Sequence, residues 1–139
     1  MEHAVTDRPA ATSPARLAAD IVAVVREGSG IRLDYSLGSL GAVDRVIGNI
    51  QREHPPIEAV LPALQGFGAY AGQVLVLATT ATWVVLDDEQ RDTFGRPFGL
   101  RTPDGRMWDP LGRAVQRYEN GPQDSLRQFC LTVAEWARP

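Results

Sequence analysis

The side chains with the greatest chemical reactivity are few in this chain, and none is spaced for metal chemistry. The two histidines are His3, close to the N-terminus, and His54, directly before two prolines. Metal binding requires several His, Cys, Asp or Glu side chains at ligand spacing, and neither histidine has such neighbours in the sequence. The run Asp87-Asp88-Glu89 lacks the glycine-spaced oxygen ligands of a calcium loop and is typical of a solvated acidic loop. The sequence therefore predicts no metal site.

Nucleophilic catalysis is not indicated either. Cys130 is the only cysteine, and it falls on the apolar stripe expected for the last helix, where a free cysteine behaves as a small buried hydrophobe. His54 is its only candidate base in the folded part of the chain, and a catalytic cysteine needs such a base beside it. There is no G-x-S-x-G motif, no phosphate-binding loop and no dinucleotide fingerprint. We expect no catalytic residue and no cofactor, and therefore favour a protein that is not an enzyme.

The basic residues give a weaker indication. All fourteen are arginine, which with the many alanines suggests a high-GC genome of actinobacterial type, and the net charge is only −3. Residues 91–117 hold six Arg and three Asp, and Arg113 and Arg117 share a helix face that Arg106 could join. This could be an anion-binding patch, but a solvated face is favoured because nucleic-acid binders carry a stronger basic bias with interleaved aromatics. The sequence predicts no nucleic-acid partner.

Six polar or aromatic side chains near the ends of predicted elements are the candidate binding residues. They are Tyr70, Gln73, Arg106, Trp108, Asn120 and Asp124. They would converge on one face if the predicted hairpin packed beside the central helix. The alternative is structural: Asn120 and Asp124 would end and cap helices, and Tyr70 and Gln73 would form hydrogen bonds in the interior. Because Trp and Arg are enriched at interface hot spots, the corner from Arg106 to Trp108 is the favoured interface.

Two of these positions belong to motifs that resemble a known family. The segments GAYAGQV (68–74) and NGPQDSL (120–126), with Trp83 and the hairpin between them, resemble an uncharacterised bacterial domain-of-unknown-function family of actinobacterial type, with an aYxGEvl…W…NGxxDSL pattern. The resemblance covers about residues 33–129 and implies no mechanism. Gln73 stands where the family pattern has Glu, and an amide cannot serve as a general base. Cys130 stands where Tyr is common.

The elements that would position these residues follow from periodicity and turn signals. In the first half, the sequence predicts a helix from Ser13 and Pro14 to Gly28, a short strand or extended linker over 31–35, and a helix capped by Ser36 or Ser39. A central helix from Ile57 to about Thr79, a strand over 83–86 and an acidic loop over 87–93 follow. The last part is predicted to hold a hairpin over 98–108 with a Pro-Asp-Gly turn, a helix from Pro110 to Asn120, and a last helix capped by Asp124. This order predicts an α+β domain with about five helices around a central buried helix and a small antiparallel sheet of two or three strands.

The stretch 57–86 has almost no charge and is the organising feature of the predicted fold. A helix that is apolar nearly all round is normally buried, so a core position is favoured over a membrane span. Gly68 and Gly72, one turn apart, predict close approach of a neighbouring element. Residues 1–12 are expected to be a flexible tail without a signal peptide, and 13–139 a single domain. With no disulfide, a cytoplasmic protein that contacts no membrane is the simplest expectation.

Two functions remain open. The favoured one is a small non-enzymatic module that binds a protein partner. The module would be an accessory, regulatory or immunity-type protein. The alternative is a small-ligand binder or an enzyme with a pocket lined by Tyr70, Gln73 and Arg106. A homo-oligomer is compatible with either.

Overall fold

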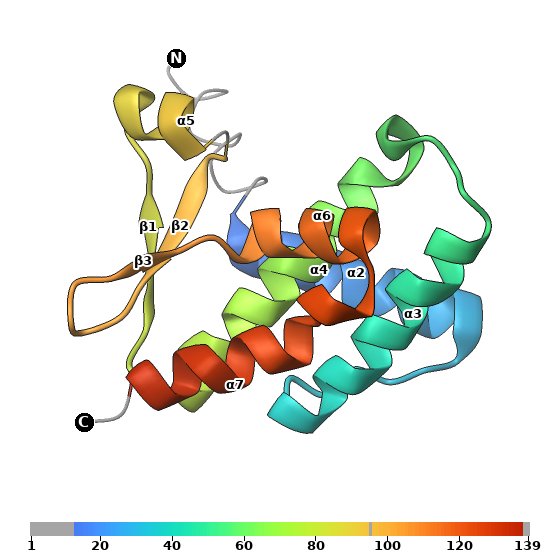
Figure 1. Ribbon diagram of the computed structural model, residues 1–139. Coiled ribbons are helices and arrows are strands. Elements are labelled where there is room, and N and C mark those ends of the chain that lie inside the picture. Colours follow the sequence, from blue (N-terminus) through green and yellow to red (C-terminus); the bar gives the residue numbers. More distant parts are fainter. Residues whose placement is uncertain (1–12, 95, 138–139) are drawn as a thin grey trace, which may run out of the picture.

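The computed structural model describes residues 13–94 and 96–137 and has the predicted α+β architecture. In chain order its elements are α2 (Pro14–Ser29), the 3-10 turn η1 (Leu37–Ser39), α3 (Leu40–Arg52), α4 (Ile57–Ala78), β1 (Thr82–Val85), α5 (Asp88–Phe94), β2 (Phe98–Arg101), β3 (Met107–Trp108), α6 (Pro110–Asn120), the 3-10 turn η2 (Pro122–Asp124) and α7 (Leu126–Trp136). The sheet lies at one side of the helices (Figure 1). The predicted tail, with His3, lies outside the described residues.

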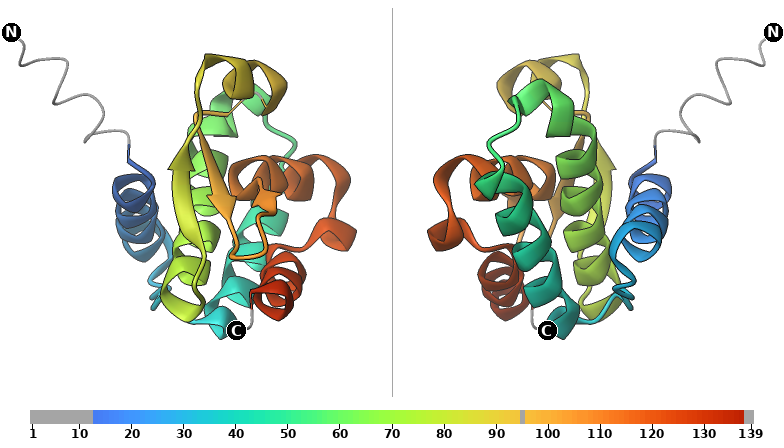
Figure 2. Two further views of the ribbon diagram at one scale, coloured as in Figure 1. Left: turned by 90° about the vertical axis from the view of Figure 1, so that its left-hand side faces the viewer. Right: turned by 90° about the vertical axis from the view of Figure 1, so that its right-hand side faces the viewer.

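Helix α4 is the centre of the fold, as its uniform apolar composition predicts. Its middle is fully buried, including Leu64, Phe67, Tyr70 and Val74. Helices α2 and α6 make the most extensive contacts with it, and α2 lies on the opposite side of α4 from α6 and α7 (Figure 2). A helix covered on both sides needs apolar residues around most of its circumference, which explains why α4 has so little polar face.

Close approach at two glycines of α4 fixes how the other elements dock. A Cβ atom added at Gly68 would lie 2.4 Å from Cα of Leu111 in α6, and one added at Gly72 would lie 2.2 Å from the indole ring of Trp83 in β1. Both distances are far inside van der Waals contact. The prediction that Gly68 and Gly72 admit a neighbour is confirmed, and the neighbours are α6 and the sheet.

The sheet is antiparallel with strand order β1-β2-β3. Trp83 lies opposite Leu100, Val85 opposite Phe98, and Leu100 opposite Trp108. Leu100 and Phe98 are buried, so the face that carries these side chains is the one turned to α4. The predicted strand over 83–86 begins and ends one residue earlier, at Thr82–Val85.

Most predicted helix ends are confirmed by their caps. The side chains of Ser13, Asp109 and Ser125 each accept a hydrogen bond from the backbone N–H three residues on, and Pro14 and Pro110 occupy first-turn positions where no N–H is needed. The prediction that Asp124 caps the last helix is wrong. Residues Pro122–Asp124 form a 3-10 turn, and α7 begins only after Ser125.

The structure selects between two options for one segment and corrects the prediction for another. Residues 31–35 form an extended linker without strand pairing, the second of the two options left open by the sequence. The acidic loop predicted over 87–93 is instead largely helix α5. The backbone N–H of Gln90 donates to Asp87 Oδ1 at 2.8 Å, and the N–H of Asp87 donates to Gln90 Oε1 at 3.0 Å. This reciprocal capping box stabilises a short helix where composition alone indicated a loop.

Among the described residues, α4 is the one helix whose length and composition would suffice to cross a membrane. In the structure 56% of its most apolar 18-residue window is buried inside the fold. Core helices of globular domains meet the same criteria of length and composition, and the packing of α2 and α6 on α4 supports that role.

Candidate functional site

The turn between β2 and β3 is held by one threonine and one aspartate. The buried Thr102 hydroxyl donates to Asp104 Oδ1 at 2.6 Å and accepts from the Trp108 indole N–H at 3.0 Å. The N–H of Arg106 also donates to Asp104 Oδ1, at 3.1 Å, and Gly105 adopts the left-handed φ of 90° that the turn requires. The hydrogen bond from Thr102 is the main cause that lowers the pKa of Asp104 below its ordinary value. The Asp104 carboxylate is therefore built into the turn.

This turn holds Arg106 over the end of α7. The Arg106 guanidinium carbon lies 3.7 Å from the centre of the Trp136 ring, and Nε lies 3.4 Å from Asp104 Oδ2. The Arg106 side chain is 51% exposed and Trp136 is 48% exposed. We call Asp104, Arg106 and Trp136 the hairpin corner. It presents a half-exposed indole with a stacked guanidinium, a pairing common at protein interfaces.

Three further candidate residues connect to this region through the Phe129 ring of α7. Trp108 meets Phe129 edge-on at 6.1 Å, and the Arg113 guanidinium lies 5.0 Å from the centre of the same ring. Arg113 pairs with Asp124 at 3.7 Å, and Asn120 Nδ2 donates to Asp124 Oδ2 at 2.7 Å. The structure therefore brings Trp108, Asn120 and Asp124 into one series of contacts along α6 and α7. Trp108 is half-buried, consistent with its corner position.

Tyr70 is fully buried and serves the interior. Its hydroxyl accepts from the backbone N–H of Tyr35 at 2.8 Å and lies 2.6 Å from the Ser39 hydroxyl. Tyr35 has a φ of 65°, rare for a residue with a side chain, and its ring lies 4.9 Å from that of Tyr70. Burial raises the pKa of Tyr70 above its ordinary value, so the hydroxyl stays protonated. Tyr70 thus fastens the 31–39 segment to α4.

Gln73 has a comparable structural task. Its side-chain oxygen accepts from the Trp83 indole N–H at 3.0 Å, and Gly72 on the same helix leaves room for that indole. Only an acceptor is required of residue 73 in this bond, and a Glu carboxylate would supply one equally well. Tyr70 is therefore a buried residue that bonds within the fold, and the partly buried Gln73 also bonds within the fold.

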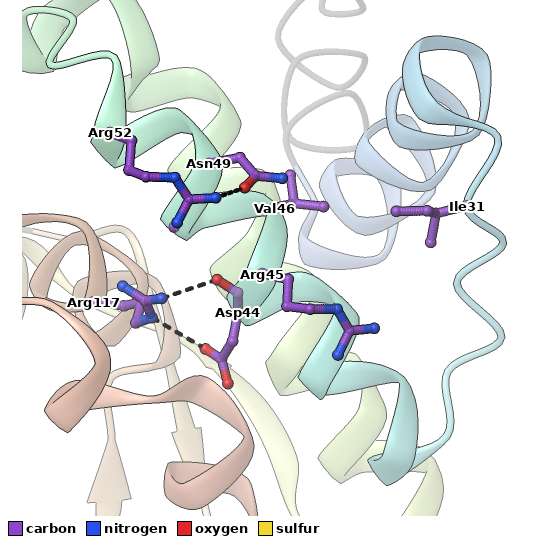
Figure 3. A pocket seen from close by; sticks show the side chains of 8 residues that line it. Ile31, Asp44, Arg45, Val46, Asn49, Arg52 and Arg117 are labelled. Atoms are coloured by element: carbon purple, nitrogen blue, oxygen red, sulfur yellow. Dashed lines mark hydrogen bonds and ion pairs between the residues drawn. The ribbon is translucent and has the colours of Figure 1, made fainter.

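Arg117 lies where α3, α6 and α7 meet and is only 5% exposed. Its Nη2 donates to the Asp44 backbone oxygen at 3.0 Å (Figure 3), and its Nη1 donates to Gln51 Oε1 at 3.3 Å. Its Nε is buried without a hydrogen-bond acceptor, yet it lies 3.5 Å from Asp44 Oδ1. The carboxylate therefore balances the guanidinium charge although their geometry does not make a hydrogen bond.

The Asp44 carboxylate also caps α7 from another helix. It accepts from the Ser125 hydroxyl at 2.7 Å and from the backbone N–H groups of Leu126 and Arg127 at 2.8 and 3.2 Å. A carboxylate at a helix N-terminus receives otherwise unpaired N–H groups and favourable dipole interaction. We call Asp44, Gln51, Arg117 and Ser125 the helix junction. Its contacts hold α3, α6 and α7 together.

A hollow of about 430 Å³ beside this junction is lined by Arg45, Arg52 and Arg117 among others. Their guanidinium groups do not converge on one point. Arg45 extends away from Arg117, and Arg52 Nη2 donates to Asn49 Oδ1 (Figure 3). Of the three arginines that could have formed one patch, Arg117 is buried, and Arg106, Arg113 and Arg117 pair with Asp104, Asp124 and Asp44 respectively. This favours local ion pairs over an anion-binding patch.

The pocket expected from Tyr70, Gln73 and Arg106 is not assembled by these side chains. Tyr70 bonds to the 35–39 segment, Gln73 to β1, and Arg106 stacks on α7. The hollow on α3 and two others, beside Arg101 and beside Leu77, are lined by other residues. Cys130 is buried with Sγ 3.7 Å from the Ala71 backbone oxygen, and burial raises the pKa of its thiol, so it remains a thiol at neutral pH. Within the described residues no group of three or more His, Cys, Asp or Glu side chains is placed to hold a metal ion.

Sequence reasoning missed Trp136 and Asp44. By its spacing Trp136 continues the apolar stripe of the last helix, but it lies in the final turn of α7 and is 48% exposed among the described residues. That terminal position was the available signal. For Asp44 no local signal existed, because its partners lie 73 to 83 residues away.

Comparisons with protein-family models, with curated proteins and with solved structures give no match. The resemblance to the aYxGEvl…NGxxDSL family stays a prediction.

Proposed function

We propose that this protein is a small non-enzymatic module that binds a protein partner through the hairpin corner. The observation that carries the proposal is the stacked pair of Arg106 and Trp136, each about half exposed on a rigid turn and a helix end. Trp and Arg are the residues most enriched at binding hot spots, because a large ring or a planar guanidinium buries much area with few rotatable bonds.

The stiffness of the corner supports this function. Thr102, Asp104 and Trp108 fix the turn by hydrogen bonds, so the Arg106 backbone is held before any partner arrives. A preorganised surface loses little conformational entropy on binding and therefore retains more of its interaction energy. A half-exposed indole stacked on a guanidinium fits a contact residue better than a core residue.

The arrangement of the remaining polar candidates supports a binding role over a catalytic one. Tyr70 and Gln73 are engaged in interior hydrogen bonds, and Asp124 pairs with Asn120 and Arg113. A general acid or base must reach its substrate, and these groups are already occupied by neighbours that hold the fold.

The test is affinity capture of partners from the native host with wild-type protein, the Trp136→Ala variant and a control. Val24→Ala is the matched control, because Val24 is also an exposed apolar side chain (59% exposed) but lies on α2, across α4 from α7. We expect the same partner to be recovered by the wild type and Val24→Ala, and its recovery to fall at least about tenfold with Trp136→Ala. Equal recovery by all three proteins would rule out the hairpin corner as the binding surface.

A further inference from the structure

The outer edge of β1 is open for strand pairing. The sheet order places β1 at an edge, and no described residue pairs with its far side. The N–H of Leu86 donates to the Pro97 oxygen, and alternate residues of an antiparallel pair bond to the same neighbour, so Val84 and Thr82 also bond toward β2. The backbone groups of Trp83 and Val85 therefore point away from the sheet.

The open edge is limited to these two residues. On one side, the N–H of Ala81 donates to Thr79 Oγ1 at 3.0 Å, and on the other, the N–H of Asp87 donates to Gln90 Oε1 at 3.0 Å. Edge strands are commonly protected by a charged side chain, a proline or a bulge. The strand Thr82–Val85 is short, which limits pairing, but it reads TWVV without a charged side chain or proline, and Val85 is 73% exposed.

We propose that this edge pairs with the same edge of a second copy of the chain, giving a symmetric antiparallel dimer with one continuous sheet. The contact goes beyond the proposed function and does not involve the hairpin corner. If Trp83 of each copy pairs with Val85 of the other, the four outward N–H groups meet four outward carbonyl oxygens. Val84 of one copy then faces Val84 of the other across the two-fold axis.

The side chains fit this register. Trp83 and Val85 lie on the same face of the sheet, so each exposed Val85 comes beside the indole of Trp83 of the second copy. Aromatic and β-branched residues are favourable cross-strand neighbours. An isologous contact of this kind needs no second surface, because the same four residues supply both sides.

The expected affinity is modest. A four-residue strand buries less than the ~1,200 Å² of total area usual for stable complexes, so we expect dissociation in the micromolar range. Sedimentation velocity of the full chain from about 1 µM to about 1 mM should show a concentration-dependent shift from monomer to dimer. A wild type that stays monomeric over this range would overturn the proposal.

One matched pair of variants locates the contact. Val85→Lys, at an exposed position, should weaken dimerisation at least about tenfold, while Val24→Lys on α2 should leave it unchanged. Circular dichroism of each variant checks that folding is intact.

Other results would refute the second copy as the occupant. A dimer that persists in Val85→Lys would place the contact elsewhere. A monomer whose binding to a captured protein is lost in Val85→Lys would assign the edge to a partner's strand instead. Trp136→Ala separates the two proposals, because it should lower partner recovery at least about tenfold and leave the sedimentation behaviour unchanged.

Discussion

Two arginines on neighbouring parts of the chain show opposite uses of the same side chain. Arg117, in the helix junction, is buried, bonds to the Asp44 backbone and to Gln51, and faces a carboxylate. Arg106, in the hairpin corner, is half exposed and rests on one aromatic ring with one carboxylate beside it. Removing Arg117 would leave the partly buried Asp44 without its cation, whereas water can replace Arg106.

This difference indicates which contacts stabilise the fold and which are available to a binding partner. The helix junction joins α3, α6 and α7 through contacts that no other element can supply, so we expect it to set stability. The hairpin corner joins only a turn to a helix end. We therefore expect substitutions there to change the unfolding free energy little and partner binding strongly. The predictions below test that separation.

The largest effect is expected for Arg117→Met, which keeps the aliphatic volume but removes the guanidinium. Breaking a buried ion pair by removing one partner costs about 3–5 kcal/mol of unfolding free energy. We expect the lower end of this range, because the Asp44 carboxylate keeps its hydrogen bonds from the start of α7. Urea denaturation followed by circular dichroism measures this loss. Arg113→Met, one turn earlier on α6, removes a more exposed pair with Asp124 and should cost no more than about 1 kcal/mol. Similar losses for the two variants would contradict the assigned role of the helix junction.

A second interior polar contact should have a smaller effect. Tyr70→Phe removes the hydroxyl that holds the Tyr35 backbone and Ser39, and leaving a buried N–H without its acceptor costs about 1–3 kcal/mol. The variant should also increase amide hydrogen exchange in the 31–39 segment. Tyr35→Phe is the control, since it keeps the backbone N–H and alters a half-buried ring, with an expected change within about 0.5 kcal/mol. Unchanged exchange in Tyr70→Phe would show that the segment is held by other contacts.

Substitution in the hairpin corner should affect partner binding more than stability. Arg106→Ala removes the stacked guanidinium and should lower the unfolding free energy by no more than about 1 kcal/mol, the value of an exposed cation–π contact. It should increase the solvent exposure of Trp136, measurable by iodide quenching of fluorescence, while partner recovery falls. A loss of stability as large as that of Arg117→Met would make the corner part of the fold's core.

The smallest effect is expected in acid. Folding lowers the pKa of Asp104, so the folded state binds fewer protons than the unfolded state as the carboxyl titrates. The stabilisation is present above the ordinary value of 3.8 and is lost as pH falls through the lowered pKa. An NMR titration of the Asp104 carboxyl should give a midpoint below 3.8, and Thr102→Val should move it upward. An unshifted midpoint would mean that the turn does not hold the carboxylate.

Local patterns determined much of this fold. The uncharged stretch 57–86 identified the buried helix, Ser13-Pro14 and Asp109-Pro110 marked helix starts, and Pro-Asp-Gly marked the hairpin, because each signal depends on residues within one or two turns of each other. Helix α5 could have been found by the same means, since Asp87 and Gln90 have the spacing of a capping box.

Only the tertiary structure decided how those elements use their polar side chains. The sequence identified Tyr70 and Gln73 as exceptions in an apolar helix, but their interior roles depend on Ser39 and Trp83, which the folding of α4 against its neighbours brings near. The same holds for the two arginines. Arg106 and Arg117 are alike in type and local charge, and burial separates them, because burial depends on which distant elements pack around a residue.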